Sequence, residues 1–216
     1  MLEEAADRPA RDPAGSLRTT ATLAIVGGLS WALLPMWDAL GGNGFWKLLF
    51  FAVPPLLIAA GLLGVHRFFR GTYGRAGRAG FLLSFSGLLL MAAGNAGEVA
   101  SVAMSGKENE AAHLVFFLGF VLVAIPGAVL LGAALRRVEP SGGLVRTSAL
   151  LLIVTLTLSI LFGFVGSALA DPESDTGFWL AIATPYGLTW ALLGAGLWTG
   201  GYERTSEHSG SDSHGG

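Results

Sequence analysis

The sequence predicts an all-α integral membrane protein, a bundle of six transmembrane helices with both termini in the cytoplasm. Two observations predict the helical membrane fold, and a third predicts its orientation. The 216 residues are 52% hydrophobic and only 13% charged, about half the charged share of an average soluble domain. The charged residues separate six long apolar runs, and Lys and Arg are concentrated in alternate connections between these runs.

The six apolar runs are each long enough to cross a bilayer. A hydrocarbon core about 30 Å thick requires roughly 20 helical residues, because each residue rises about 1.5 Å along the axis. Only helices and closed barrels satisfy their main-chain hydrogen bonds in hydrocarbon. A barrel strand would alternate in polarity, whereas these runs are continuously apolar. The predicted spans are 19–37, 46–66, 79–103, 112–135, 147–170 and 178–201.

Polar segments flank this transmembrane domain, which fills residues 19–203. Residues 1–18 contain Pro9 and Pro13 and are predicted to form a disordered cytoplasmic arm. A cleaved signal peptide is the alternative, since Arg18 precedes an apolar run, but that run is of full spanning length and no clear small-residue cleavage site follows it. Residues 204–216 are rich in Ser, Gly and His and are predicted to form a disordered cytoplasmic tail.

The basic residues predict which side of the membrane each connection faces, since Lys and Arg are enriched in short cytoplasmic loops. The segments predicted to lie outside contain only Lys47 and Lys107. The segments predicted to lie inside contain eleven arginines: Arg8, Arg11, Arg18, Arg67, Arg70, Arg75, Arg78, Arg136, Arg137, Arg146 and Arg204. This division predicts a multi-pass protein of the cell membrane with both termini inside.

The composition argues against several classes of function. A net charge of −2 and the absence of a basic helix or finger motif argue against nucleic-acid binding. The chain has no cysteine, which excludes disulfides, thiolate metal sites and thiol catalysis. The four histidines do not cluster, and no metalloprotease or serine-hydrolase motif occurs. We therefore expect no metal, no cofactor and no catalytic residue.

Glycine, proline and tryptophan predict how the spans pack. The 32 glycines would let helix backbones approach closely, as small residues do in membranes. Proline removes an amide donor and bends a helix. The prolines inside the second, fourth and sixth spans are candidate hinges, with static bends as the alternative: Pro54, Pro55, Pro126 and Pro185. Tryptophans near span ends, Trp31 among them, are expected as anchors at the membrane interface.

A weak internal repeat accompanies these features. The tripeptide Gly-Phe-Trp opens the second span at Gly44 and the sixth span at Gly177, 133 residues later. The second and fourth spans share a proline and a glycine at an offset of 71, Pro55 with Pro126 and Gly61 with Gly132. These matches predict three pseudo-repeated helical hairpins, with chance similarity in a restricted alphabet as the alternative.

A polar stripe on the third span is the candidate functional site. Glu98 is the only acidic residue inside a long apolar stretch, and an ionisable side chain at membrane depth is by default a functional hypothesis. Asn95 lies one turn before it, and Ser84 and Ser101 fall close to the same helix face. We expect Glu98 to accept a proton, a cation or a small solute, with Asn95 holding it by a hydrogen bond. The alternative is that Glu98 marks the outer end of the span and that Asn95 joins neighbouring helices.

The connection between the second and third spans is the second candidate site. Arg67, Arg70, Arg75 and Arg78 alternate there with aromatic residues and glycines. Arginines attract anionic lipid headgroups and aromatic rings settle at the interface, so this segment is expected to contact anionic headgroups on the cytoplasmic side. A nucleotide-phosphate site is the alternative, although the Gly-Lys-Ser/Thr ending of a phosphate-binding loop is absent.

Two functions fit the sequence. The first is an accessory or structural membrane protein that is not an enzyme and that contacts other membrane subunits or a second copy of itself through its helices. It is favoured by the scarcity of buried charge and by the absence of a catalytic set. The second is a small transporter or channel-like protein that moves protons, cations or a small solute past Glu98 and Asn95. The bilayer itself is the partner common to both.

Overall fold

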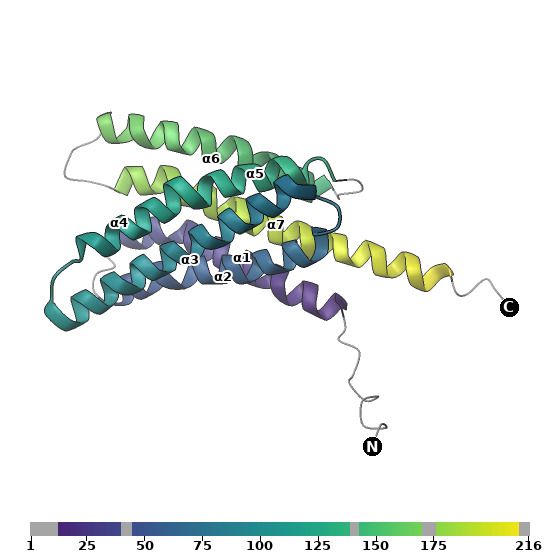
Figure 1. The fold of residues 1–216 in the computed structure, drawn as a ribbon, viewed down its shortest axis with the longest axis horizontal. Helices are drawn as coiled ribbons and strands as arrows, with labels where there is room; N and C mark the ends of the chain where they lie inside the picture. Colours follow the sequence, from purple (N-terminus) through teal and green to yellow (C-terminus); the bar gives the residue numbers. More distant parts are fainter. Residues whose placement is uncertain (1–12, 40–44, 139–142, 170–175, 212–216) are drawn as a thin grey trace, which may run out of the picture.

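The computed structural model describes residues 13–39, 45–138, 143–169 and 176–211, and in this part of the chain every regular element is a helix (Figure 1). The all-α prediction is confirmed. Five continuous helices and one segmented helix follow in order. The continuous ones are α1 (Pro13–Ala39), α2 (Phe45–Phe69), α3 (Gly74–Ser105), α6 (Gly143–Leu169) and α7 (Thr176–Ser211). The segmented one comprises α4 (Glu110–Leu118), the π-helical turn η1 (Gly119–Ala124) and α5 (Ile125–Leu135).

Five helical segments among the described residues are long and apolar enough to cross a membrane, as a multi-pass membrane protein requires. They are Gly15–Met36, Phe51–Phe69, Gly74–Ser105, Glu110–Leu135 and Leu180–Thr199. The described apolar part of α6 is shorter, Gly143–Val154. The membrane orientation of the termini and the hairpin repeat stay predictions.

Three helices extend well beyond the predicted spans, and the first is α1, which begins at Pro13, inside the segment 1–18 predicted as a disordered arm. Helix α3 begins at Gly74 and not at residue 79, because Gly74 adopts a φ of +66° that turns the chain directly into the helix. The link from α2 to α3 is therefore only a few residues long. Helix α7 continues to Ser211, into the segment predicted as a disordered tail, and residues 1–12 and 212–216 lie outside the described chain.

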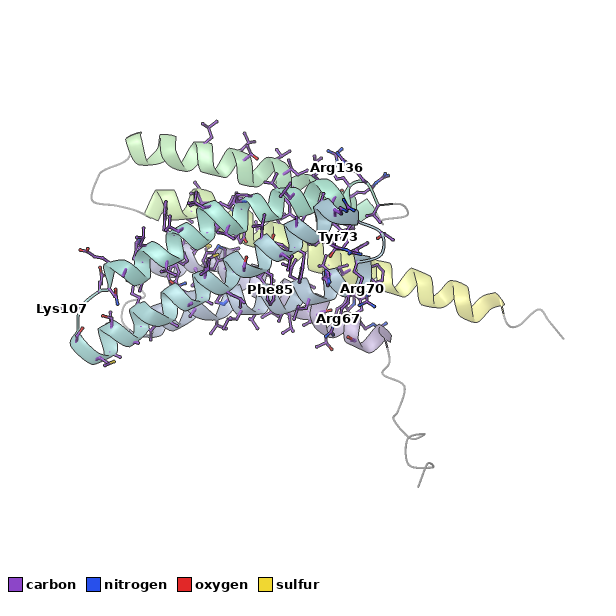
Figure 2. The ribbon with its side chains drawn as sticks, viewed as in Figure 1. Arg67, Arg70, Tyr73, Phe85, Lys107 and Arg136 are labelled. Atoms are coloured by element: carbon purple, nitrogen blue, oxygen red, sulfur yellow. The ribbon has the colours of Figure 1, made fainter. Side chains whose placement is uncertain are left out.

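The helices form a closed ring. Each helix packs against the next one in sequence. The α4–η1–α5 segment packs against α3, α5 packs against α6, and α7 packs against α1 to close the ring. Helix α1 begins and α7 ends at the same end of the bundle (Figure 1). Figure 2 shows Arg67, Arg70 and Arg136 at that end and Lys107 at the opposite end. We call the first the basic end and the second the Lys107 end.

Most neighbouring helices meet backbone to backbone at glycines. A Cβ added to Gly28 in α1 would lie 2.5 Å from the main-chain oxygen of Gly187 in α7. A Cβ added to Gly87 in α3 would lie 2.6 Å from Cα of Ala124 in η1. Among the described residues, no glycine contact of this kind joins α2 to α3. That interface is held by polar and aromatic side chains, which form the candidate site.

Candidate functional site

The four residues of the predicted polar stripe lie on α3, but they face different neighbours. Ser84 and Asn95 are buried, Glu98 is partly buried, and Ser101 lies close to the end of the helix. Asn95 and Glu98 are three residues apart, and α3 packs between α2 on one side and the α4–η1–α5 segment on the other. As a result the Asn95 side chain reaches α2 and the Glu98 side chain faces α4.

Asn95 binds the backbone of α2. Its Nδ2 donates a 2.8 Å hydrogen bond to the main-chain oxygen of Phe51, and its side chain is 5% exposed. In an α-helix this oxygen would accept from the amide of residue 55, but residue 55 is proline and has no amide hydrogen. Asn95 thus satisfies a carbonyl that the sequence of α2 leaves without a donor. The sequence suggests a hydrogen bond from Asn95 to Glu98. In the structure the Asn95 Nδ2 is instead bonded to the main-chain oxygen of Phe51.

Glu98 faces the start of α4. Its Oε2 lies 3.9 Å from Nδ1 of His113, and the Glu98 side chain is 13% exposed while that of His113 is 60% exposed. Asn109 fixes the start of α4, because its Oδ1 accepts hydrogen bonds from the amides of Ala111 and Ala112. The carboxylate and the imidazole therefore come from two elements joined by a short turn.

The Glu98–His113 pair lines an open cleft of about 390 Å³ at the Lys107 end of the bundle. The remaining lining residues add two more carboxylates and an apolar wall: Glu108, Asn109, Glu110, Leu114 and Phe117. Such a cleft would attract protons, inorganic cations or organic cations. Among the described residues, however, no group of three or more His, Cys, Asp or Glu side chains is placed to hold a metal ion.

The two serines of the stripe are not brought to Glu98. Ser84 is fully buried, and its Oγ has no hydrogen-bond partner within the described chain. It precedes Asn95 by eleven residues, which corresponds to roughly 16 Å along a helix axis. The Oγ of Ser101 donates to the main-chain oxygen of Lys107 at 3.0 Å, so it ties the end of α3 to the turn that follows.

The candidate hinge prolines act differently from one another. Helices α2 and α7 stay continuous through Pro54, Pro55 and Pro185. Of these four prolines, only Pro126 lies next to a departure from α geometry. The six residues of the π-helical turn η1 directly precede Ile125 and Pro126. A π-turn often forms at a functional site. Here it also has a structural explanation, because it accommodates the amide hydrogen that Pro126 lacks. The structure contains one further intrahelical proline, Pro35 in α1, that the sequence reading had not singled out.

The predicted arginines lie together at the basic end. Arg67, Arg70, Arg75 and Arg78 are all exposed, at the end of α2, in the link and at the start of α3. Nη2 of Arg78 donates to the main-chain oxygen of Arg70 at 3.4 Å. Their placement fits a surface at headgroup depth, while contact with lipid stays a prediction.

Next to these arginines lies a side-chain cluster formed by His66, Tyr73 and Phe81. This cluster was not predicted from the sequence. Nδ1 of His66 is hydrogen-bonded to the hydroxyl of Tyr73, and the His66 ring stacks on Phe81 of α3 with centroids 4.1 Å apart. Tyr73 also covers Gly77, where any Cβ would meet its ring. Burial raises the pKa of Tyr73, against a smaller lowering by Arg78, so its hydroxyl stays protonated at neutral pH. The seven-residue spacing of a helix-end histidine and a tyrosine in the following turn was the available signal.

An aromatic cluster fills the interior, and it corrects one expectation. Trp31 was expected at the membrane interface, but it is 0% exposed. Its ring lies 6.2 Å from those of Phe51 and Phe116 and 6.5 Å from that of Tyr186, measured between centroids. Closure of the ring by α7 buries this face of α1, which span length alone does not predict. Nε1 of Trp31 and the hydroxyl of Tyr186 have no hydrogen-bond partner in the described chain.

Compared with protein-family models, with curated proteins and with solved structures, the chain matches none of them.

Proposed function

We propose that this chain is an accessory or structural membrane protein that acts through helix contacts with another membrane subunit or with a second copy of itself. The observation that carries the proposal is the bond from Asn95 to Phe51. The buried amide at the centre of the candidate site is engaged by the fold itself. It therefore serves helix association, and its burial leaves it little access to a solute.

The packing of the bundle also supports an accessory or structural function. Backbones meet directly where glycines of α1 and α7 face each other, at Gly28 and Gly187. The interior between the helices is filled by aromatic side chains such as Trp31, Tyr186 and Trp190, each at most 1% exposed. A bundle packed in this way is suited to present a rigid outer surface. Rigid surfaces favour association because little ordering entropy is lost on binding.

Cysteine cross-linking tests this proposal, because the native chain contains no cysteine. Single cysteines would be placed in the full chain at exposed positions of different helices: Leu29, Leu82, Leu122, Leu158 and Leu188. In native membranes we expect cross-linked adducts of discrete mass from one helix face only. An adduct at twice the 22.4 kDa chain mass would identify a second copy.

Ser84→Cys is the matched control, because this position is fully buried and cannot reach a partner. Adducts of continuous mass from every face would indicate random collision. The absence of a discrete adduct at all five positions would refute the accessory function.

A second candidate function, movement of protons or small cations, is supported by the cleft at the Lys107 end. The partly buried Glu98 carboxylate lies at the wall of this cleft, next to His113. Purified protein in liposomes containing a pH-sensitive dye would be compared with Glu98→Gln. The matched control is Glu108→Gln, which removes the same charge from an exposed position of the same cleft. Flux that is abolished only by Glu98→Gln would support transport, and the absence of flux for protons, Na⁺ and K⁺ would refute it.

A further inference from the structure

A separate groove lies at the basic end, between the first turns of α1 and the last turn of α2. It has a volume of about 220 Å³. The residues that line it are Ser16, Leu17, Thr20, Gly64, Arg67 and Phe68. None of them belongs to the Glu98 cleft, which lies at the opposite end of the bundle.

The floor of the groove depends on a close contact between α1 and α2. A Cβ at Gly64 would collide with the hydroxyl of Thr20, so only glycine allows this approach. Thr20 Oγ1 donates to the main-chain oxygen of Leu17 at 2.9 Å, which fixes its orientation. The Thr20 oxygen and the Ser16 hydroxyl therefore lie on one side of the groove, and Arg67 supplies the charge on the other.

Arg67 is the residue that indicates an anionic ligand. It is exposed, and within the described chain it makes no hydrogen bond or ion pair. A guanidinium group binds phosphate oxygens through two parallel hydrogen bonds. Ser16 lies in the first turn of α1, where the helix dipole also favours an anion. The groove thus brings the exposed guanidinium of Arg67, the hydroxyl of Ser16 and the first turn of α1 around one small volume.

The surroundings of Arg67 indicate that the anion carries an acyl chain. Arg67 lies two residues before the end of the apolar segment Phe51–Phe69, the depth of lipid headgroups. Leu63 and Leu56, four and eleven residues before Arg67, share its helix face, and they are 37% and 47% exposed. An apolar stripe thus leads along α2 directly into the groove.

We propose that this groove is a binding site for an anionic phospholipid, with the headgroup phosphate at Arg67 and Ser16 and an acyl chain along Leu63 and Leu56. The positive-inside rule predicts that this end lies at the cytoplasmic leaflet, where anionic lipids give a negative surface potential. The site is independent of the proposed accessory function. It needs no protein partner and lies at the other end of the bundle from Glu98.

Native mass spectrometry of the detergent-purified full chain tests the site, with phosphatidylglycerol and phosphatidylcholine added at equal concentration. We expect retention of phosphatidylglycerol and about a tenfold loss of its affinity in Arg67→Gln, the cost of one charge-assisted contact. Arg67→Lys should recover part of the affinity, because the charge returns without the planar fork. Unchanged circular dichroism would show that the loss does not arise from unfolding.

The matched control is Arg136→Gln, which removes the same charge at the same end of the bundle (Figure 2) from an exposed position outside the groove. It should leave the affinity for phosphatidylglycerol within about twofold. Three results would overturn the proposal: an equal loss in Arg136→Gln, equal retention of phosphatidylcholine, or displacement of the lipid by millimolar inorganic phosphate. The last result would identify a site for a soluble phosphate.

Discussion

Asn95 donates a 2.8 Å hydrogen bond to the main-chain oxygen of Phe51, a carbonyl that Pro55 leaves without its intrahelical donor. Three residues on two helices are thereby coupled. Pro55 creates an unsatisfied acceptor inside a membrane helix, where no water is at hand to donate to it. Asn95 supplies the donor only while α2 and α3 are packed together. The proline thus makes helix packing a condition for satisfying the backbone.

Replacement of Asn95 by alanine should destabilise the native chain by about 1 kcal/mol, the usual size of a polar contact between membrane helices. The same replacement should cost clearly less in a Pro55→Ala background. Residue 55 then supplies its own amide to the Phe51 carbonyl, and Asn95 is no longer required. Unfolding by SDS titration from mixed micelles measures all four proteins of this double-mutant cycle.

Ser86→Ala is the control for this cycle, since the Ser86 hydroxyl donates within its own helix, to the main-chain oxygen of Leu82. Its effect should be small and independent of residue 55. Strictly additive effects of Asn95→Ala and Pro55→Ala would contradict the coupling.

The helices could be predicted from sequence because length and hydropathy are local properties. The ends of α2 and of the α4–η1–α5 segment lie within three residues of the predicted spans 46–66 and 112–135. The partners of single residues could not be predicted, because they depend on which helices are neighbours and at what rotation. The sequence identified Asn95 as a polar residue in a span, but it did not identify Phe51 as its acceptor.

Trp31 illustrates the same limit. A tryptophan near the end of a span is usually an interface anchor, and nothing local to α1 indicates otherwise. Trp31 is buried because α7 closes the ring against α1 and brings Tyr186 onto its face. Glu98 lies toward the Lys107 end of α3. Its pairing with His113 follows from the tight turn between α3 and α4, which the sequence did not define.

Gly28→Ala should destabilise the bundle by about 1–3 kcal/mol, the usual cost of overpacking. The added Cβ would lie 2.5 Å from the Gly187 oxygen and 2.6 Å from the Ala191 amide nitrogen. Both are backbone atoms of α7, so relief requires the two helices to separate. Thermal unfolding in detergent measures the effect. Gly71→Ala is the control, with nothing within 4 Å of its added Cβ, and a comparable loss there would contradict the packing argument.

The stability of the bundle should fall as pH rises above 10, partly through Tyr73. Burial raises the pKa of this phenol above its ordinary value of 10.0, so the folded state holds the proton more tightly than the unfolded state. The contribution of Tyr73 is fully present below pH 10 and is lost as pH rises through the folded pKa. Unfolding between pH 8 and 12 should show a shallower decline in Tyr73→Phe than in the native chain. Identical slopes would contradict this assignment.

Tyr186→Phe should leave the stability unchanged or raise it, in contrast to Tyr73→Phe at neutral pH. Both changes remove one buried phenolic oxygen. The Tyr186 hydroxyl has no hydrogen-bond partner among the described residues, whereas the Tyr73 hydroxyl is bonded to His66. Removal of a buried polar group without a partner relieves a desolvation cost of about 1–3 kcal/mol, while removal of a bonded one leaves its partner unsatisfied. SDS titration of the two variants at pH 7 measures the difference. A larger loss for Tyr186→Phe than for Tyr73→Phe would show that Tyr186 has a hydrogen-bond partner in the interior, either the indole of the neighbouring Trp190 or bound water, and would contradict the prediction.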